Sequence, residues 1–246
     1  MFAKTVGSDV RSYVPAYSLS AAVPARTVSI FDVDRTLTRK PTYSAFLLFG
    51  AWRTARWRLG FVPLVVAAML AYKMGFTDRA SLKQFMQARM LGPTIANDRA
   101  KHLAEAFAER MIRGGIYAQA RAMIENETAN GRRVILATAA HHFYVDALAE
   151  ALGIGDVVAT CSRYRRGKLT AEIAGQNCYG AAKRDQVAAL FDREGASRRD
   201  LHVRVFSDDL SDRPLFEWAD EPIAVNPSRR LKSYAQTRGW TILDWR

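Results

Sequence analysis

The chain has 246 residues, which fits one large domain or one domain with an insertion. Nearly half of the residues are apolar, enough for a packed core, and the formal net charge of +12 indicates an anionic partner: nucleic acid, an anionic lipid surface or a phosphorylated metabolite. No histidine stands near Cys161 or Cys178 at zinc-ligand spacing, which argues against a zinc site and favours buried free thiols in a reducing cytosol over a disulfide.

Residues 1–26 contain no long apolar run, and Asp9 and Arg11 interrupt them, so they do not look like a signal peptide. Serine, alanine, proline and tyrosine dominate from Ser8 to Ala25. We expect an N-terminal extension over residues 1–26 that is either a poorly ordered tail or a strap along the surface.

The first strand signal, from Thr27 to Phe31, ends in two carboxylates, Asp32 and Asp34, followed by Thr36. Alternate residues of a strand point to the same side, so the two carboxylates would project into one small volume. Like charges this close repel each other unless a cation neutralises them, and Mg²⁺ prefers carboxylate oxygen. A turn or a helix cap, both of which favour aspartate, is the alternative explanation of this pair alone.

Residues 40–115, called the insertion below, are helical in pattern and hold no convincing strand. Asp and Glu are absent from Arg35 to Thr77, where basic and aromatic residues surround an apolar run of 14 residues from Leu59 to Tyr72. Such a run is too short to span a bilayer upright, whereas its basic and aromatic flanks suit an anionic membrane interface. A helix packed against its neighbours explains the run at least as well, and nucleic acid is the least favoured partner.

Further strand signals follow the insertion, and helical stretches separate most of them. We expect strands at Arg133 to Ala137, Val157 to Thr160, Val203 to Phe206 and Ile223 to Val225, and helices at His102 to Arg113, Ile116 to Asn130, Val145 to Leu152 and Ala181 to Glu194. This alternation predicts an α/β fold with a mostly parallel sheet covered on both faces. Residues 27–39 and 116–246 would form this core, which binds ligands beyond the carboxyl ends of its strands.

Polar residues recur where these strands and helices end or begin. Thr138 and Ala139 follow the strand VILA, Lys183 opens a helix, and the strand VRVF leads into an acidic cluster of Asp208, Asp209 and Asp212. One carboxylate can attack phosphorus, a second can move the proton, further acids can hold Mg²⁺, and a lysine and a hydroxyl can neutralise the transferred phosphoryl group. Each residue alone would more often be a helix cap or a surface side chain, but together they predict phosphoryl transfer.

The order D-x-D-x-T, Thr, Lys and acidic pair resembles the motifs of the haloacid dehalogenase superfamily. The stretches ILATAAHHFYVDALAEALGIGDVVAT, NCYGAAKRDQV and SDDLSDRPLFEWADEPIAVNP look like its phosphoserine-phosphatase-like subclass IB. The resemblance implies a three-layer, Rossmann-like core with a helical C1-type cap, which the insertion would form.

The same resemblance implies the roles of individual residues. Asp32 would be the nucleophile, Asp34 the general acid and base, and Thr138 and Lys183 would hold the phosphoryl oxygens. The implied Mg²⁺ ligands are Asp32, the backbone carbonyl of Asp34, Asp208, Asp209 and Asp212. We assign substrate binding to Arg35, Thr36, Arg39, Lys40 and Ala139.

The basic stretch after the first motif, including Arg39 and Lys40, should repel an ammonium group and so disfavours phosphoserine as the substrate. The apolar, basic insertion resembles, more weakly, the cap of bacterial phosphatidylglycerophosphate phosphatases. The leading hypothesis is a Mg²⁺-dependent phosphatase of an anionic, lipid-borne phosphate, cytoplasmic and peripheral at the inner face of the membrane. A soluble phosphatase of small metabolites and a non-catalytic, membrane-associated binding module remain the alternatives.

Overall fold

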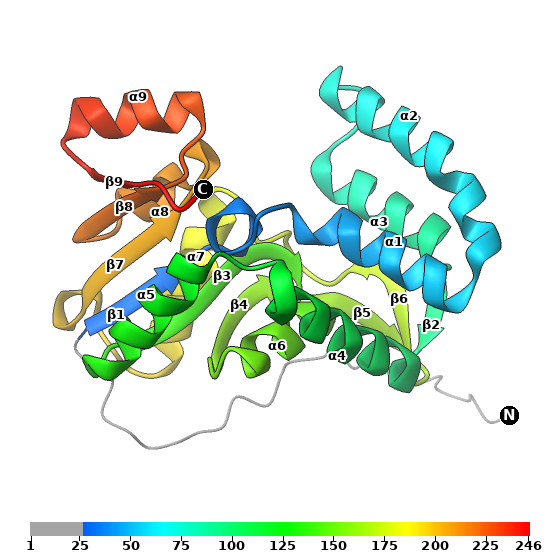
Figure 1. Ribbon diagram of the computed structural model, residues 1–246, viewed down its shortest axis with the longest axis horizontal. Helices are drawn as coiled ribbons and strands as arrows, with labels where there is room; N and C mark the ends of the chain where they lie inside the picture. The colour runs from blue at the N-terminus through cyan, green and yellow to red at the C-terminus, as the bar shows by residue number, and fades with distance from the viewer. Residues whose placement is uncertain (1–26) are drawn as a thin grey trace, which may run out of the picture.

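A computed structural model describes residues 27–246, so the N-terminal extension predicted for residues 1–26 lies outside the described residues. Its centre is a six-stranded sheet in the order β4-β3-β1-β7-β8-β9, and every pair of neighbours is parallel (Figure 1). The strands are β1 (Thr27–Phe31), β3 (Arg133–His141), β4 (Asp156–Thr160), β7 (His202–Ser207), β8 (Glu221–Val225) and β9 (Thr241–Leu243). The α/β fold with a parallel sheet is therefore confirmed.

The strand order explains where a site should form. β1 pairs with β3 on one side and with β7 on the other, and the chain moves outward from β1 in both directions. Ligands bind at such a reversal of strand order, beyond the carboxyl ends of the strands. Asp32 directly follows β1, and Asp208 directly follows β7, so both lie at this edge.

Helices cover both faces of the sheet. One apolar cluster joins Phe31 and Leu136 of the sheet to α5 (Ala118–Ala129) and α6 (His142–Ala151). A second cluster joins the opposite face, including Ile30, to the remaining helices of the core, which are α7 (Ala181–Arg193), α8 (Arg213–Phe216) and α9 (Arg229–Arg238). Because helices cover both faces, residues of both faces are buried in the inner part of β1, β3 and β7.

The insertion lies between β1 and β3. It contains α1 (Thr42–Thr54), the short 3-10 helix η2 (Arg56–Phe61), α2 (Val62–Lys73), α3 (Arg79–Met90), β2 (Thr94–Ala96) and α4 (Asn97–Gly114). Its entry and exit are joined: Thr38 forms a β-bridge with Ile116, and the backbone N–H of Arg39 donates to the carbonyl of Gly115 at 2.9 Å. Figure 1 shows α1, α2 and α3 beyond this connection, while α4 lies against α6 of the core.

The prediction that the insertion holds no strand is wrong for three residues. β2 pairs antiparallel with β6 (Lys168–Ile173), which pairs with β5 (Ser162–Arg165) in a small second sheet. Only Ile95 of β2 is buried. A strand of three residues shows no readable alternation of apolar and polar residues, and its formation depends on the partner strand.

Two further predictions concern the cysteines and the apolar run. Cys161 and Cys178 are free thiols, and burial raises the pKa of Cys178 to about 12, which makes it an inert core residue.

None of the described helices combines the length and apolar character that crossing a bilayer requires.

Candidate active site

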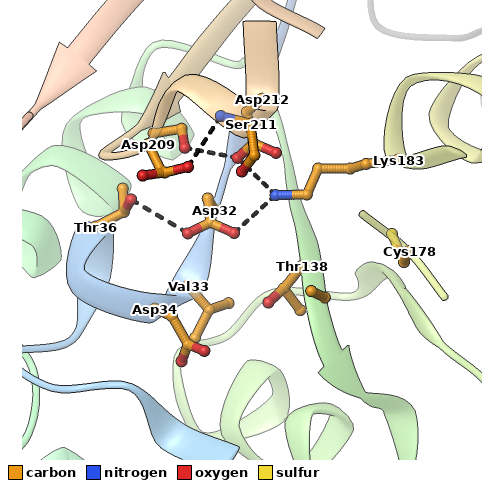
Figure 2. Close-up of polar contacts among 12 residues, drawn as sticks. Asp32, Val33, Asp34, Thr36, Thr138, Cys178, Lys183, Asp209, Ser211 and Asp212 are labelled. Atoms are coloured by element: carbon orange, nitrogen blue, oxygen red, sulfur yellow. Dashed lines mark hydrogen bonds and ion pairs between the residues drawn. The ribbon is translucent and has the colours of Figure 1, made fainter. Parts of the chain in front are cut away.

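Asp32 lies at the centre of the polar edge of the sheet. Its backbone N–H donates to the carbonyl of Phe206 at 2.9 Å, which continues the pairing of β1 with β7 by one residue. The chain then enters a tight turn, η1 (Val33–Leu37), and Thr36 Oγ1 donates back to Asp32 Oδ2 at 3.3 Å (Figure 2). Thr36 is fully buried and does not line the pocket, and its hydrogen bond helps to position the Asp32 carboxylate.

Lys183 carries the positive charge of the site. It lies in the first turn of α7, and its Nζ donates to Asp32 Oδ1 at 2.8 Å and to Asp212 Oδ2 at 2.7 Å. Ser207 Oγ donates to the same Asp212 oxygen at 2.6 Å. Burial opposes the charge of Lys183, but the carboxylates of Asp212 and Asp32 raise its pKa above the ordinary value, so it remains an ammonium group.

Asp34 and Asp32 line the same pocket, although the chain around Asp34 forms a turn and not a strand. The strand ends at Phe31, and in the turn that follows the Asp34 side chain points away from the group formed by Asp32, Lys183 and Asp212 (Figure 2). Asp34 Oδ1 instead accepts hydrogen bonds from the backbone N–H and the Oγ1 of Thr42, both at 2.7 Å. These bonds fix one oxygen, and the residue still lines the same pocket as Asp32.

The acidic cluster after β7 supplies excess negative charge. Burial raises the pKa of Asp208 to about 8, and the charges of Asp32 and Asp209 add to this effect. Burial likewise raises the pKa of Asp32 to about 7, although Lys183 pulls it down. Asp212 Oδ1 is buried and has no hydrogen-bond partner among the described residues. Three carboxylates therefore face one ammonium group.

The donor set fits a hard divalent cation, because carboxylate oxygens with unmet charge and hydrogen bonding are the ligands that Mg²⁺ prefers. Within residues 27–246, no three His, Cys, Asp or Glu side chains stand close enough to hold a metal by themselves. A cation here would need backbone oxygen or water as well. Asp209 also lines the pocket, and its Oδ1 caps the short helix η4 (Leu210–Asp212) by accepting from the Ser211 N–H at 2.9 Å.

Thr138 and Ala139 lie where β3 becomes irregular. The register with β4 shifts between Ala137 and His141, and within this irregular stretch Thr138 and Ala139 line the pocket. Thr138 Oγ1 accepts from the backbone N–H of Ala140 at 3.1 Å, so its hydroxyl hydrogen is free to donate to an anion.

The three basic residues near the first motif separate in the structure. Arg35 lines the pocket, in a left-handed conformation with φ of 62°. Arg39 and Lys40, which were assigned to substrate binding, do not line it. After the bridge from Thr38 to Ile116 the chain turns away from the site, and Arg39 stacks on the Tyr117 ring at 4.8 Å. Both residues line a separate groove of about 480 Å³ between α1 and α4.

The catalytic pocket of about 470 Å³ also contains insertion residues that the sequence analysis missed. The buried Lys83 of α3 donates from Nζ to the Asn177 Oδ1 at 2.7 Å and to the carbonyl of Ala139. Arg79 of the same helix stacks on Tyr179 at 4.1 Å. A readable signal existed, because Lys83 falls on the apolar face of α3 with Met86 and Met90, where an unpaired lysine is rare.

Three comparisons place these features among known proteins. The profile of the haloacid dehalogenase-like hydrolases matches residues 30–217. "Phosphoserine phosphatase SerB1" of Mycobacterium tuberculosis is 28% identical over 243 residues, which cover 98% of this chain and 75% of the relative. A Bordetella pertussis protein of unknown function is 27% identical with a TM-score of 0.79, covering 90% of this chain and all of its own.

A substrate-bound phosphoserine phosphatase has the same fold. It is 17% identical to this chain with a TM-score of 0.62, and the match covers 92% of this chain and 95% of that structure. At this identity the likeness concerns the fold alone, and it agrees with the parallel sheet and its covering helices.

Proposed function

The chain belongs to the haloacid dehalogenase-like hydrolase family, and on this premise we propose that it is a Mg²⁺-dependent phosphatase that hydrolyses phosphomonoesters through an aspartyl-phosphate intermediate. The observation that carries the proposal is the contact of Asp32 with Lys183 at 2.8 Å at the reversal of strand order. A buried carboxylate beside a fixed ammonium group, in a pocket with a second carboxylate, is suited to attack a phosphoryl group.

The polar residues at the reaction centre have distinct roles in this reaction. Asp32 attacks phosphorus, while Lys183 and the Thr138 hydroxyl neutralise the phosphoryl oxygens as charge builds on them. Asp34 gives a proton to the leaving oxygen and then takes one from the attacking water. The hydrogen bonds from Thr42 to one Asp34 oxygen hold this carboxyl group in position and leave its other oxygen for proton transfer.

Mg²⁺, when bound, would offset the negative charge shared by the phosphate and the carboxylates. We propose Asp32, Asp208 and the backbone carbonyl of Asp34 as its protein ligands, with water completing the coordination. Asp212 then braces Lys183, as the 2.7 Å contact indicates, and Asp209 keeps its capping role.

The pocket favours an anionic leaving group. Besides the aspartates of the reaction centre, its lining contains no acidic side chain, whereas the cations Arg35, Lys73 and Arg79 all contribute to it. A substrate with an ammonium group near the phosphate would therefore be repelled, which argues against phosphoserine. We propose an anionic phosphomonoester, carried on a lipid, which would place the protein peripherally at the cytoplasmic face of a membrane.

A small soluble metabolite is the second candidate, favoured by the resemblance to the relative named phosphoserine phosphatase. A panel that includes phosphoserine, sugar phosphates and phosphatidic acid in vesicles separates the two, because a lipid phosphatase should prefer the vesicle-borne ester. Activity on phosphoserine above all other esters would contradict the argument from the basic lining.

The test of the chemistry is Asp32→Asn. We expect kcat with Mg²⁺ to fall by about 10³-fold or more, because the amide is a poor nucleophile. Asp192→Asn, an exposed residue of α7, is the matched control and should behave as the parent. If the purified chain hydrolysed no phosphomonoester, or Asp32→Asn equalled the parent, a non-catalytic binding module would replace the proposal.

A further inference from the structure

The exposed apolar surface of the molecule is concentrated in the insertion. All large hydrophobic side chains that are exposed among residues 27–246 lie between Leu48 and Phe76. Six of them form what we call the apolar ridge, on α2 and at its two ends: Trp57, Leu64, Val66, Leu70, Met74 and Phe76. Phe76 is 78% exposed and Trp57 is 67% exposed, values that a soluble surface seldom keeps without a partner.

The helix α2 is apolar on its outer side as well as its inner side. Val65 is buried, and Val62, Ala68 and Tyr72 pack against the core cluster, which accounts for the inner side. A surface helix normally carries polar residues on the other side. In α2 that side consists of apolar residues, which are Pro63, Leu64, Val66, Ala67 and Leu70. Figure 1 shows α2 at the outer edge of the insertion, with α1 and α3 to one side of it.

Positive charges lie beside the ridge, and the first acidic side chain after it is Asp78, two positions beyond Phe76. Asp and Glu are absent from Arg35 to Thr77. Arg56 stacks on the Trp52 ring at 4.5 Å and Arg58 on the Trp57 ring at 4.6 Å, and neither forms an ion pair within the described part of the chain. Exposed aromatic rings beside cations are the pattern of a membrane interface with anionic lipid.

We propose that the apolar ridge docks on an anionic lipid bilayer, with α2 lying in the interface. The helix has 12 residues, about 18 Å, so it lies on a bilayer and does not cross it. A second copy of the chain fits less well, because a two-fold contact through this face would bring the same arginines against each other.

Docking of the apolar ridge on a bilayer also bears on the choice of substrate, a step that rests on the proposed function. Met69, Tyr72 and Lys73 of α2 line the catalytic pocket, and Val66 and Leu70 of the apolar ridge lie on the adjacent face of the same helix. The bilayer and the pocket would therefore be separated by no more than one helix width, roughly 10 Å. Docking through the ridge brings the pocket to the depth of phosphorylated headgroups.

Vesicle flotation of the purified full-length chain tests the surface. We expect the chain to float with vesicles of phosphatidylcholine and phosphatidylglycerol, to float less as salt rises, and to stay at the bottom with phosphatidylcholine alone. The double variant Val66→Glu/Leu70→Glu should lower the partition by about tenfold or more, since two apolar side chains leave the lipid and two negative charges are added. Neither residue lines the catalytic pocket.

Ala118→Glu/Ala122→Glu is the matched control, because both alanines are exposed at the same spacing on α5 of the core. It should float as the parent does, and so should Asp32→Asn, since docking needs no turnover. Failure of the parent to float with anionic vesicles, or equal flotation of Val66→Glu/Leu70→Glu, would overturn the docking proposal. Hydrolysis of phosphomonoesters without flotation would overturn docking alone, and flotation without any hydrolysis would overturn the proposed function alone.

Discussion

Basic side chains of the core form ion pairs with acidic ones, whereas most of those in the described insertion do not. In the core, Arg133 donates to Asp156 at 2.7 Å and to Glu194 at 2.6 Å, and the buried Glu127 receives bonds from Arg132 and Arg204. Within the described insertion, the one ion pair between its residues is the exposed contact of Lys101 with Glu105. Paired charges hold the sheet and its helices together, whereas the unpaired cations of the insertion are free to attract an anion.

The largest test of this contrast is the removal of a paired charge from the core. Glu127→Gln should lower the free energy of unfolding by about 3 kcal/mol, because a neutral amide at this buried position deprives Arg132 and Arg204 of the carboxylate that they share. Arg56→Gln in the insertion should change it by less than about 0.5 kcal/mol, since Arg56 is exposed. Urea unfolding of both variants measures the difference, and equal losses would remove the contrast.

Lys83 is the exception inside the insertion, because it is buried without a carboxylate partner. Burial, with the charge of Arg79 added, lowers the pKa of Lys83 from 10.5 to about 7. Between these values the unfolded chain binds more protons than the folded chain, so the free energy of unfolding should rise with pH. The parent should therefore gain about 2 kcal/mol over Lys83→Met between pH 7 and pH 9.

Unfolding curves of the parent, Lys83→Met and the exposed control Lys101→Met, recorded across that pH window, measure this gain. Lys101→Met should follow the parent at every pH. If the free energies of unfolding of the parent and of Lys83→Met changed with pH in parallel, Lys83 would keep its charge in the folded state and would not differ from the other cations of the insertion.

The smallest expected effect is at Arg35, where the two regions meet. Its φ of 62° favours glycine, so Arg35→Gly should raise the free energy of unfolding by up to about 1 kcal/mol. The same change should raise KM for anionic phosphomonoesters up to about fivefold, because a cation leaves the pocket lining. Steady-state kinetics and urea unfolding test the two effects separately, and an unchanged KM for every anionic substrate would remove Arg35 from substrate binding.

The sequence predicted what local pattern encodes. Apolar runs and the residues at their ends located β1 at its observed bounds, the helix that begins before Lys183, and the acidic cluster after β7. The parallel sheet followed from the alternation of strands with helices.

The remainder depended on partners far away in the chain. β2 is a strand because β6 pairs with it, and hydrogen bonds from Thr42 set the orientation of the Asp34 side chain. Lys83 is held at the pocket by its hydrogen bond to Asn177, which lies 94 residues further along the chain. Arg39 and Lys40 were assigned to substrate binding because they form a basic stretch after the first motif, but beyond the bridge from Thr38 to Ile116 they line a separate groove.

That bridge has an evolutionary consequence. The chain leaves the sheet and returns to it at one point, held by the pairing of Thr38 with Ile116 and by the Arg39 N–H on Gly115. The entropy of closing a segment at such a point grows only slowly with its length. The segment can therefore be lengthened, shortened or exchanged during descent while β1 and β3 keep their register. Lineages that share one nucleophile can in this way diverge in what they hydrolyse and in where they do it.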